Sequence, residues 1–481
     1  MPPPIICWFQ QDLRLEDNRA LAAAVATGRP ILPLYILDDE TPGAWAMGGA
    51  SRWWLHHSLA SLAQSLEARS SALVLRRGAA KEVLDALIEE SGATALYFTR
   101  RYEPFAKELE QTLAADLTAR GLEVRRFAGS LLLEPESVAT KDDQPYKVFT
   151  PFYKACLGRL DLGESPAALP ERLPLPKRLP PSDCLDDWGL LPRSPDWAGG
   201  LRETWTPGEA GALARLQAFL DGPMAAYDEA RDRPDHESTS RLSPHLHFGE
   251  LSPRLCWQQT QRALEAMGER AEPGATSFLR ELIWREFSTH LLFHWPDLPE
   301  APFRADFARF PWAEDATFLE AWQRGRTGYP IVDAGMRQLW HTGWMHNRVR
   351  MVVASFLAKH LLIPWQAGAA WFWDTLVDAD LANNSASWQW VAGCGADAAP
   401  YFRVFNPMTQ GRKFDPEGAY VRRWVPELAG LPSAHIHEPW SAPSDVLAAA
   451  SVALGQDYPG PIVDHAAARA GALEAFAQLK A

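Results

Sequence analysis

Residues 378–390 read DADLANNSASWQW and place two acids, two amides and two indoles between segments with helical spacing. Short acids and amides suit a helix interior poorly, because their side chains compete with the backbone for hydrogen bonds. Their concentration indicates a polar ligand that is held by side chains beside a stacking surface. The alternative is a loop with two helix caps and two core tryptophans, and the stretch alone does not decide between them.

Length and composition set the class of protein. A chain of 481 residues exceeds one ordinary hydrophobic core, so we expect two or three domains. Hydrophobic content of 47% with 22% charged residues is typical of a globular protein. No apolar run approaches the roughly 20 residues of a membrane span, and the N-terminus lacks a signal-peptide pattern. We therefore expect a cytoplasmic protein with no membrane contact.

Cysteine spacing and net charge exclude some further classes. The five cysteines are scattered and form no CxxC pair: Cys7, Cys156, Cys184, Cys256 and Cys394. Neither a disulfide framework nor a metal site is indicated, and we expect each to be buried filler. The net charge of −13 argues against a protein that coats nucleic acid non-specifically. It leaves room for a local basic groove, because nearby charges set the field at a site.

Residues 1–135 alternate short apolar strands with amphipathic helices. The predicted strands are Ile5–Phe9, Ile31–Leu37, Ala72–Leu75, Ala95–Thr99 and Val124–Ala128, and the predicted helices are 17–27, 51–68, 79–91 and 103–120. This rhythm predicts an α/β domain with a doubly wound parallel sheet, which binds ligands at the carboxyl ends of its strands. The chain has no GxGxxG and no GxxxxGK[ST], so a conventional dinucleotide or triphosphate site is not supported.

The remainder of the chain divides into a linker and an all-α domain. We place the linker at 136–206, because prolines break both periodicities across 160–205, and expect it to run over the surface. Residues 207–481 show helical spacing, with helices predicted at 208–220, 253–267, 275–294, 316–324, 331–341, 345–360 and 366–376. Such a helical domain can enclose a deep cofactor cavity between its helices.

Three polar clusters mark the helical half. The run TSRLS (239–243), with Tyr227 and Arg231 upstream, suits a phosphate, although hydroxyls are equally common at helix starts. Glu281 and Arg285 share a helix face, as a pocket edge or as an ordinary ion pair. In WMHNRVRM (344–351), the two arginines at i and i+2 must point in different directions, and a lone histidine is usually a core residue.

Basic and aromatic residues interleave after residue 390. They are Tyr401, Phe402, Arg403, Phe405, Arg412, Lys413, Arg422 and Arg423. Cations for phosphates and flat rings for an unstacked base are what a nucleic-acid groove needs. Acidic residues are interspersed, so this segment is weak evidence by itself.

Four long segments carry a resemblance. They are TSRLSPHLHFGELSPR (239–254), ELIWREF (281–287), TGYPIVDAGMRQLWHTGWMHNRVRM (327–351) and DADLANNSASWQWVAGCGADAAPYFRVFNP (378–407). Together they resemble the photolyase/cryptochrome family, densely from 227 to 440 and in architecture from 5 to 135. The resemblance implies an N-terminal α/β domain, a long linker and a helical domain that holds a U-shaped FAD.

The resemblance also assigns residues to the cofactor. Those expected at its phosphates and ribityl chain are Tyr227, Thr239, Ser240, Arg241, Leu242 and Ser243. Those expected around its rings are Phe278, Glu281, Arg285, Trp344, Arg350, Asp378, Asp380 and Asn384. Asn384 matches the residue that faces flavin N5, where an amide can accept or donate. Trp312, Trp365 and Trp388 match a tryptophan chain that carries an electron to photoexcited flavin; from the residues alone, all three are core.

Within the family, the branch that repairs cyclobutane pyrimidine dimers fits best. Its lesion-contacting set matches Glu281, Trp284, Asn347, Arg348, Met351 and Trp390. We expect Arg231 and Arg403 to contact the DNA as well, and Arg412 and Lys413 are further candidates. UV-damaged DNA would present a flipped dimer between Trp284 and Trp390, with Glu281 at a thymine edge. Excited FADH⁻ would give the dimer an electron, the ring bonds would split and the electron would return.

Alternatives and a second chromophore stay open. A (6-4) photolyase typically has a second histidine where Asn347 stands, and a cryptochrome photoreceptor shares fold and flavin. A flavin-storing or DNA-binding module would not need the whole lesion set. The segment GGASRWWLHHSL (48–59) resembles relatives near plant cryptochromes and class III photolyases, which favours a 5,10-methenyltetrahydrofolate antenna over a deazaflavin or none. The glutamate with which another branch contacts folate has no counterpart, because YEPFAK places Phe105 and Ala106 there. We expect a monomer.

Overall fold

The computed structural model describes residues 2–163, 165, 166, 168–398 and 402–479, so Tyr401 lies outside the described residues. Five parallel strands form one sheet in the order β3-β2-β1-β4-β5. The strands are β1 (Ile5–Phe9), β2 (Ile31–Leu37), β3 (Val74–Arg77), β4 (Ala95–Thr99) and β5 (Glu123–Phe127). The doubly wound sheet predicted from the sequence is confirmed, and β1 lies at its centre because it is apolar and fully buried.

Two edge strands differ slightly from the prediction. β3 starts at Val74, where pairing with Leu34 begins, and extends through Arg76 and Arg77. β5 starts at Glu123 and pairs with β4 along its length. Charged residues are tolerated in both because an edge strand keeps one side open to solvent.

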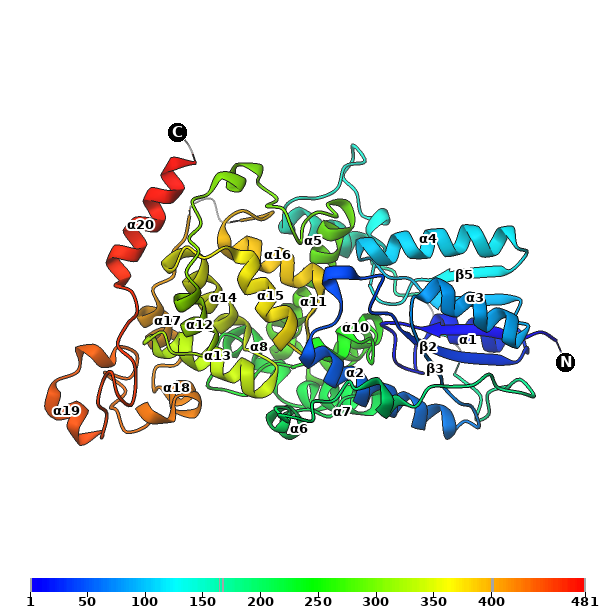
Figure 1. The fold of residues 1–481 in the computed structure, drawn as a ribbon, viewed down its shortest axis with the longest axis horizontal. Coiled ribbons are helices and arrows are strands. Elements are labelled where there is room, and N and C mark those ends of the chain that lie inside the picture. The colour runs from blue at the N-terminus through cyan, green and yellow to red at the C-terminus, as the bar shows by residue number, and fades with distance from the viewer. Residues whose placement is uncertain (1, 164, 167, 399–401, 480–481) are drawn as a thin grey trace.

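Four helices cover this sheet. They are α1 (Arg19–Ala26), α2 (Gly49–Glu67), α3 (Ala80–Ser91) and α4 (Pro104–Ala119). The Asn18 side chain accepts a hydrogen bond from the Leu21 amide and so caps α1. Figure 1 shows this α/β unit at one end of the molecule, with the helical half beside it.

The segment between the two halves contains more structure than predicted. Two helices lie within 136–206, α5 (Phe149–Arg159) and α6 (Gly199–Thr204). Phe149, Phe152 and Cys156 are buried on one side of α5. This part of the predicted linker is therefore packed into the helical half, although the domain boundaries themselves stay a prediction.

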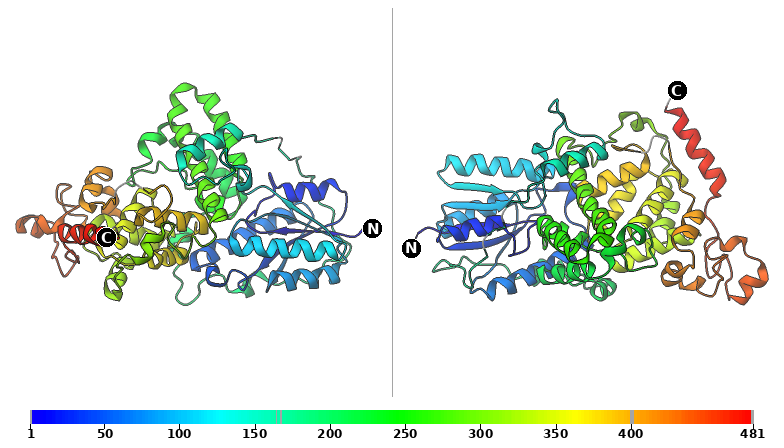
Figure 2. Two further views of the ribbon diagram at one scale, coloured as in Figure 1. Left: turned by 90° about the horizontal axis from the view of Figure 1, so that it is seen from above. Right: turned by 180° about the vertical axis from the view of Figure 1, so that it is seen from behind.

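The helical half contains the predicted helices and several short ones. They are α7 (Glu209–Leu220), α8 (Tyr227–Ala230), α9 (Ser243–His247), α10 (Pro253–Met267), α11 (Glu272–His294), α12 (Ala316–Gln323), α13 (Pro330–Thr342), α14 (Asn347–Ser355), α15 (Trp365–Thr375), α16 (Leu381–Ala392), α17 (Pro407–Phe414), α18 (Ala419–Trp424), α19 (Ser444–Ala449) and α20 (His465–Gln478). A π-helical turn, Phe356–His360, follows α14. Single 3-10 turns lie at Gly43–Trp45, Pro135–Ser137, Leu185–Trp188, Pro223–Ala226, Glu269–Ala271, Ala305–Arg309, Pro426–Leu428 and Pro439–Ser441. Both views of Figure 2 place α20 at the end opposite the sheet.

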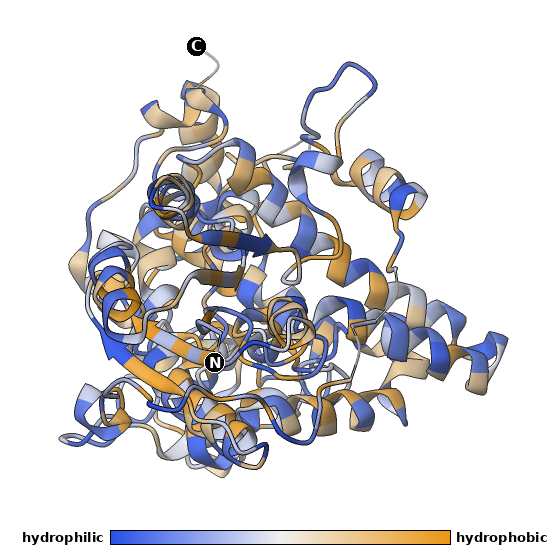
Figure 3. Cartoon of the chain, turned by 90° about the vertical axis from the view of Figure 1, so that its right-hand side faces the viewer, coloured by the Kyte–Doolittle hydropathy of each residue, from blue (hydrophilic) through white to orange (hydrophobic). Residues whose placement is uncertain are grey.

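Two expectations about local structure were wrong. The stretch 378–390, judged a poor helix interior, is mostly helix, because Asp380 serves as the N-cap of α16 and the amides fall in its first turn. Cys184 is exposed, whereas the other four cysteines are buried. Figure 3 shows apolar and polar residues alternating along the helices, as expected where one face packs inward.

A buried ion pair joins the two halves. Asp17 follows β1 and accepts hydrogen bonds from Ser252 and from the Arg254 guanidinium of α10. The side chains of Asp17 and Arg254 are only 7% and 8% exposed. Arg14 adds a second link through its hydrogen bond to the Gly249 carbonyl, at 2.8 Å. These contacts fix the orientation of the sheet against the helices.

Arg254→Met tests this link. Removing one partner of a buried pair leaves an uncompensated charge, so the free energy of unfolding should fall by about 3–5 kcal/mol. Denaturant melts followed by circular dichroism measure it. The double variant Asp17→Asn/Arg254→Met should recover most of the loss, and Arg262→Met, at an exposed site on the same helix, should change little. Equal losses in the single and double variants would contradict the assignment.

Candidate cofactor and substrate cavity

One cavity of about 520 Å³ collects the predicted cofactor residues. All fourteen line it: Tyr227, Thr239, Ser240, Arg241, Leu242, Ser243, Phe278, Glu281, Arg285, Trp344, Arg350, Asp378, Asp380 and Asn384. Helices α8, α9, α11, α14 and α16 supply its walls. Cavities of this size hold drug-sized ligands and cofactors.

The segment 378–390 supplies two carboxylates that have different partners. Asp378 accepts from Arg350 at 2.8 and 3.1 Å, in a pair beside the Trp344 ring. Asp380 caps α16 by accepting from the Asn383 amide at 2.8 Å, and it also lies 3.5 Å from His247. Burial alone would raise the pKa of Asp380, but His247 and Arg285 hold it well below its usual value. Asp380 is therefore an ionised acceptor in a half-buried wall.

Asn384 presents an acceptor to the cavity. Its side-chain NH₂ donates to the Ala369 carbonyl at 3.0 Å, and the residue is buried. With the nitrogen held, Oδ1 is the group left to accept from a cavity occupant. This arrangement suits an N–H donor on the edge of a flavin ring.

The hydroxyl run forms a polar corner. Ser240 Oγ accepts from the Leu242 amide at 3.4 Å, and Arg241 adopts a left-handed φ of 52°. The Arg241 guanidinium lies 5.1 Å from the Trp344 ring centroid and pairs with Glu237. Hydroxyls and a guanidinium that line one cavity are suitable donors for phosphate oxygens. The residues present therefore fit FAD at both its ring end and its phosphate end.

The charged face of α11 is split between the cavity and the segment before α5. Glu281 hydrogen-bonds Arg231, so the simple i,i+4 pair with Arg285 is not formed. Arg285 instead donates to the Ser130 carbonyl at 2.8 Å and lies 3.5 Å from Glu286. Glu281 thus keeps one oxygen, Oε2, for a cavity occupant.

Most of the predicted lesion residues also line this cavity. Arg231, Glu281, Trp284, Asn347, Met351 and Trp390 do so. Arg348 and Arg403 do not: Arg348 pairs with Asp232 at 2.6 Å, and the Arg403 guanidinium lies 6.0 Å from the Phe405 ring. Arg412 is paired with Glu438. As expected from their spacing, Arg348 and Arg350 have different partners.

The three predicted chain tryptophans lie in one apolar cluster. Trp388 lines the cavity and is 2% exposed, Trp365 is 1% exposed, and Trp312 is partly exposed. Gly368 of α15 permits this packing, because a Cβ there would lie 2.1 Å from the Trp388 ring. Trp312 is thus the only one of the three whose side chain is partly exposed, and the electron path itself stays a prediction.

Residues that sequence reasoning missed include His247, Asn383 and Phe372, which all line the cavity. His247 holds Asp380, and Asn383 belongs to the α16 cap. The signal for His247 was its position just after the hydroxyl run, in SPHLH. His346, in contrast, is an ordinary buried cap, whose ring accepts from the Arg348 amide at 3.2 Å.

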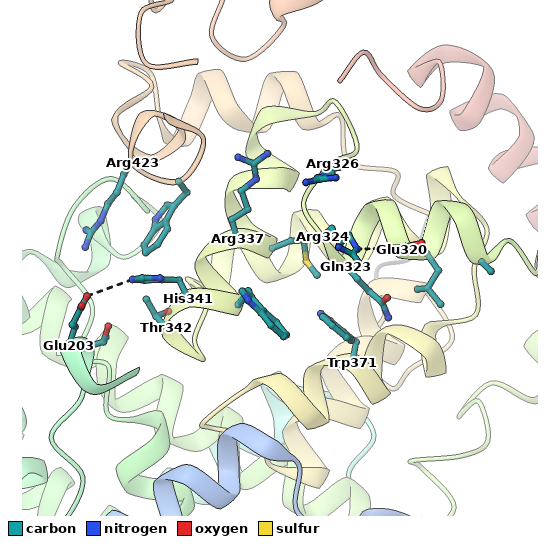
Figure 4. Close-up of a pocket in the computed structure, with 16 residues that line it drawn as sticks. Glu203, Glu320, Gln323, Arg324, Arg326, Arg337, His341, Thr342, Trp371 and Arg423 are labelled. Atoms are coloured by element: carbon teal, nitrogen blue, oxygen red, sulfur yellow. Dashed lines mark ion pairs between the residues drawn. The ribbon is translucent and has the colours of Figure 1, made fainter. Parts of the chain in front are cut away.

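A second cavity, of about 1360 Å³, opens between α12, α13, α15 and α18. Figure 4 shows Arg324 paired with Glu320 and His341 paired with Glu203 in its wall. Trp340 and Trp371 stack there with centroids 6.0 Å apart. None of the predicted site residues lines it.

Comparisons with known proteins match both halves. A model for DNA photolyase matches residues 5–176, and a model for the FAD binding domain of DNA photolyase matches residues 278–478. The chain is 52% identical to a deoxyribodipyrimidine photo-lyase of Agrobacterium fabrum, over 99% of this chain and 98% of that one. It is 40% identical to cryptochrome-1 of Arabidopsis thaliana, over 98% and 70%. A crystal structure of a bacterial class III photolyase from Agrobacterium tumefaciens superposes with a TM-score of 0.96 at 51% identity, covering 100% and 98%.

Fold and cavity together define an FAD-binding protein with an α/β domain and a helical domain. The chain belongs to the photolyase/cryptochrome family. The predicted resemblance, fold class and flavin cofactor are thereby confirmed. No helix in the described ranges is both long and apolar enough to cross a membrane.

Glu286, behind the cavity wall, gives a pH prediction. It is buried and accepts from the Leu132 and Leu133 amides, at 3.0 and 3.2 Å. Burial raises its pKa to about 7 from 4.5. Because the pKa of Glu286 is higher in the folded state than in the unfolded state, its contribution to the free energy of unfolding is fully present below pH 4.5. That contribution is lost as the pH rises through 7, by up to about 3 kcal/mol.

Glu286→Gln should therefore flatten the fall in melting temperature between pH 5 and pH 8. The amide keeps an acceptor for the two backbone N–H groups and removes the titration. Thermal melts at half-unit pH steps measure the slope. Glu89→Gln, at an exposed site, serves as control. A slope equal to that of the wild type would refute the role of Glu286.

Proposed function

We propose that this protein is a deoxyribodipyrimidine photo-lyase that repairs cyclobutane pyrimidine dimers in UV-damaged DNA. The observation that carries the proposal is the shared cavity, which collects the complete cofactor set and six of eight predicted lesion and DNA residues. Identity of 52% along nearly the whole chain to a protein of that name supports it. A cavity built only to store flavin would not need the second set.

Bound and reduced, FAD supplies an electron when it absorbs blue light. The residues proposed to hold it are those of the fourteen-member set, with Asp380, Asn384 and the hydroxyl run as its main polar contacts. The Asp378–Arg350 pair neutralises two charges in a half-buried wall and keeps both side chains in place. These contacts are proposed to hold the FAD rings in one orientation.

The other residues of the cavity are proposed to hold the lesion. Trp284 and Trp390 offer ring faces to a flipped dimer. Glu281, held by Arg231, accepts from a base N–H with its second oxygen. Asn347 is exposed at the first turn of α14, and its amide has no partner among the described residues, so it is available to a base edge. Arg348, Arg403, Arg412 and Lys413 are proposed to meet phosphates outside the cavity.

An antenna folate remains part of the proposal. Its support is the resemblance of residues 48–59, which begin α2 and pack beside α15, where Gly49 donates to Asp374 at 2.8 Å. Trp45 and Trp373 meet edge to face there, with centroids 5.8 Å apart. The absorption spectrum of gently purified protein tests it: a folate band is expected, and a deazaflavin band or flavin alone would overturn it.

Action as a cytoplasmic monomer and the domain boundaries 1–135, 136–206 and 207–481 also stay proposals.

Glu281→Gln and Asn347→Ala test the function. Purified, photoreduced wild type should split the pyrimidine dimers in a defined oligonucleotide under blue light and restore the monomeric bases. Each variant should lose repair by about tenfold or more while retaining FAD within twofold. Asn347 lies outside the cofactor set, and Glu281→Gln keeps the shape of the side chain and one acceptor oxygen beside thirteen unchanged cofactor residues. Loss of FAD ahead of repair would mean that substrate and cofactor residues are exchanged. Wild type that photoreduces but does not repair would favour a cryptochrome.

Trp388→Phe tests the electron path. It should abolish photoreduction of oxidised flavin in vitro, because a benzyl ring is far harder to oxidise than indole, while chemically reduced protein keeps repairing. Flavin absorbance under blue light with a thiol donor measures it. Trp257→Phe, another buried indole that does not line the cavity, is the matched control and should photoreduce normally. Normal photoreduction in Trp388→Phe would sink the path.

A further inference from the structure

The two indoles of the proposed lesion site are tied to a helix of the interdomain segment. Phe149, the first residue of α5, stacks on Trp284 with ring centroids 3.5 Å apart and planes 5° from parallel. Trp284 lines the cavity, whereas Phe149 does not and is only 1% exposed. Phe149 therefore lies behind Trp284, on the side away from the cavity.

The Phe149 ring is itself held from several sides. Tyr153 lies 5.7 Å away in a stacked arrangement, and Phe287 meets it edge-on at 5.8 Å. The Arg280 guanidinium lies 5.4 Å from its centroid. Packing on this many sides leaves the ring little rotational freedom, so it presents a rigid flat surface to Trp284.

Asp397 connects the same residue to the second indole. Its Oδ2 accepts the Phe149 backbone N–H at 3.3 Å, and its carbonyl accepts the Trp390 indole N–H at 3.0 Å. Trp390 and Trp284 belong to different helices, α16 and α11. The contacts Trp284–Phe149–Asp397–Trp390 therefore form a continuous bridge outside the cavity between its two aromatic walls.

We propose that Phe149 is a positioning residue that sets the orientation of Trp284 relative to Trp390, and with it the preference for a dimer over undamaged bases. This inference rests on the proposed function. A flipped dimer is larger than one base and is not flat, so its stacking depends on both the separation and the tilt of the two rings. Without the Phe149 ring stacked against it, the Trp284 ring can rotate or move away from the cavity. This movement would widen the site and leave the contacts to FAD unchanged.

Phe149→Leu is the test, and Phe152→Leu is its matched control. Phe152 lies on the same helix, is 2% exposed and contacts Phe287, without a ring contact to Trp284. The two variants lose the same atoms from equally buried sites. Affinity for a duplex with one pyrimidine dimer is measured beside affinity for the undamaged duplex, together with FAD content and repair at saturating substrate.

In Phe149→Leu, the Kd for the dimer duplex should rise about threefold to tenfold, the range expected for loss of one aromatic pair. Affinity for undamaged DNA, FAD content and repair at saturation should stay within twofold. Phe152→Leu should leave all four unchanged. The conservative variant Phe149→Tyr, which keeps the ring face, should retain most of the preference for the dimer duplex over the undamaged duplex.

A double-mutant cycle separates positioning from general destabilisation. If Phe149 acts through Trp284, adding Phe149→Leu to Trp284→Ala should not raise the Kd further. Additive losses, equal losses in Phe149→Leu and Phe152→Leu, or an unchanged preference in Phe149→Leu would each overturn the inference. If wild type shows no preference for the dimer duplex, the proposed function is overturned instead, and this inference with it.

Discussion

The Asp380 carboxylate is the contact on which the rest of the site depends. It caps α16, and that helix carries Asn384, Trp388 and Trp390, which all line the cavity. The same carboxylate is held by His247 of α9, directly after the hydroxyl run. One charge therefore fixes the start of α16 and links that helix to α9.

Helix α11 is the second organising element, and it links the cavity to the α/β half. Its face carries Phe278, Glu281 and Trp284 toward the cavity, while Arg285 and Glu286 bind the backbone of 130–133. Neighbouring residues on one helix thus serve the site and the domain junction. A shift of α11 would therefore disturb both the cavity and the contacts with residues 130–133.

Much of this was readable from the sequence, and the reasons for the failures are physical. Strand and helix periodicity located the sheet and the main helices, because burial imposes those periods. The polar stretch 378–390 was judged a poor helix interior but is mostly helical, because capping by Asp380 offsets the poor intrinsic helix propensity of the amides. The cofactor set came from a resemblance to a family. From the residues alone, it could not be decided which side chains are helix caps, which are core and which contact a ligand. Ion-pair partners such as Asp232 with Arg348 lie far apart in sequence and had no local signal.

The segment between the domains shows the same limit most clearly. Its prolines indicated an irregular surface linker, yet Phe149 and Phe152 bury one face of α5 against α11. Helix α5 has only 11 residues, a length at which an isolated helix is marginal, so its stability depends on these contacts. Phe149, the first residue of α5, stacks on Trp284, so the linker contacts a residue of the proposed substrate site. The predicted linker, α11 and α16 therefore all contribute to this side of the cavity, and the linker residue Phe149 is proposed to set the orientation of the Trp284 ring that α11 carries.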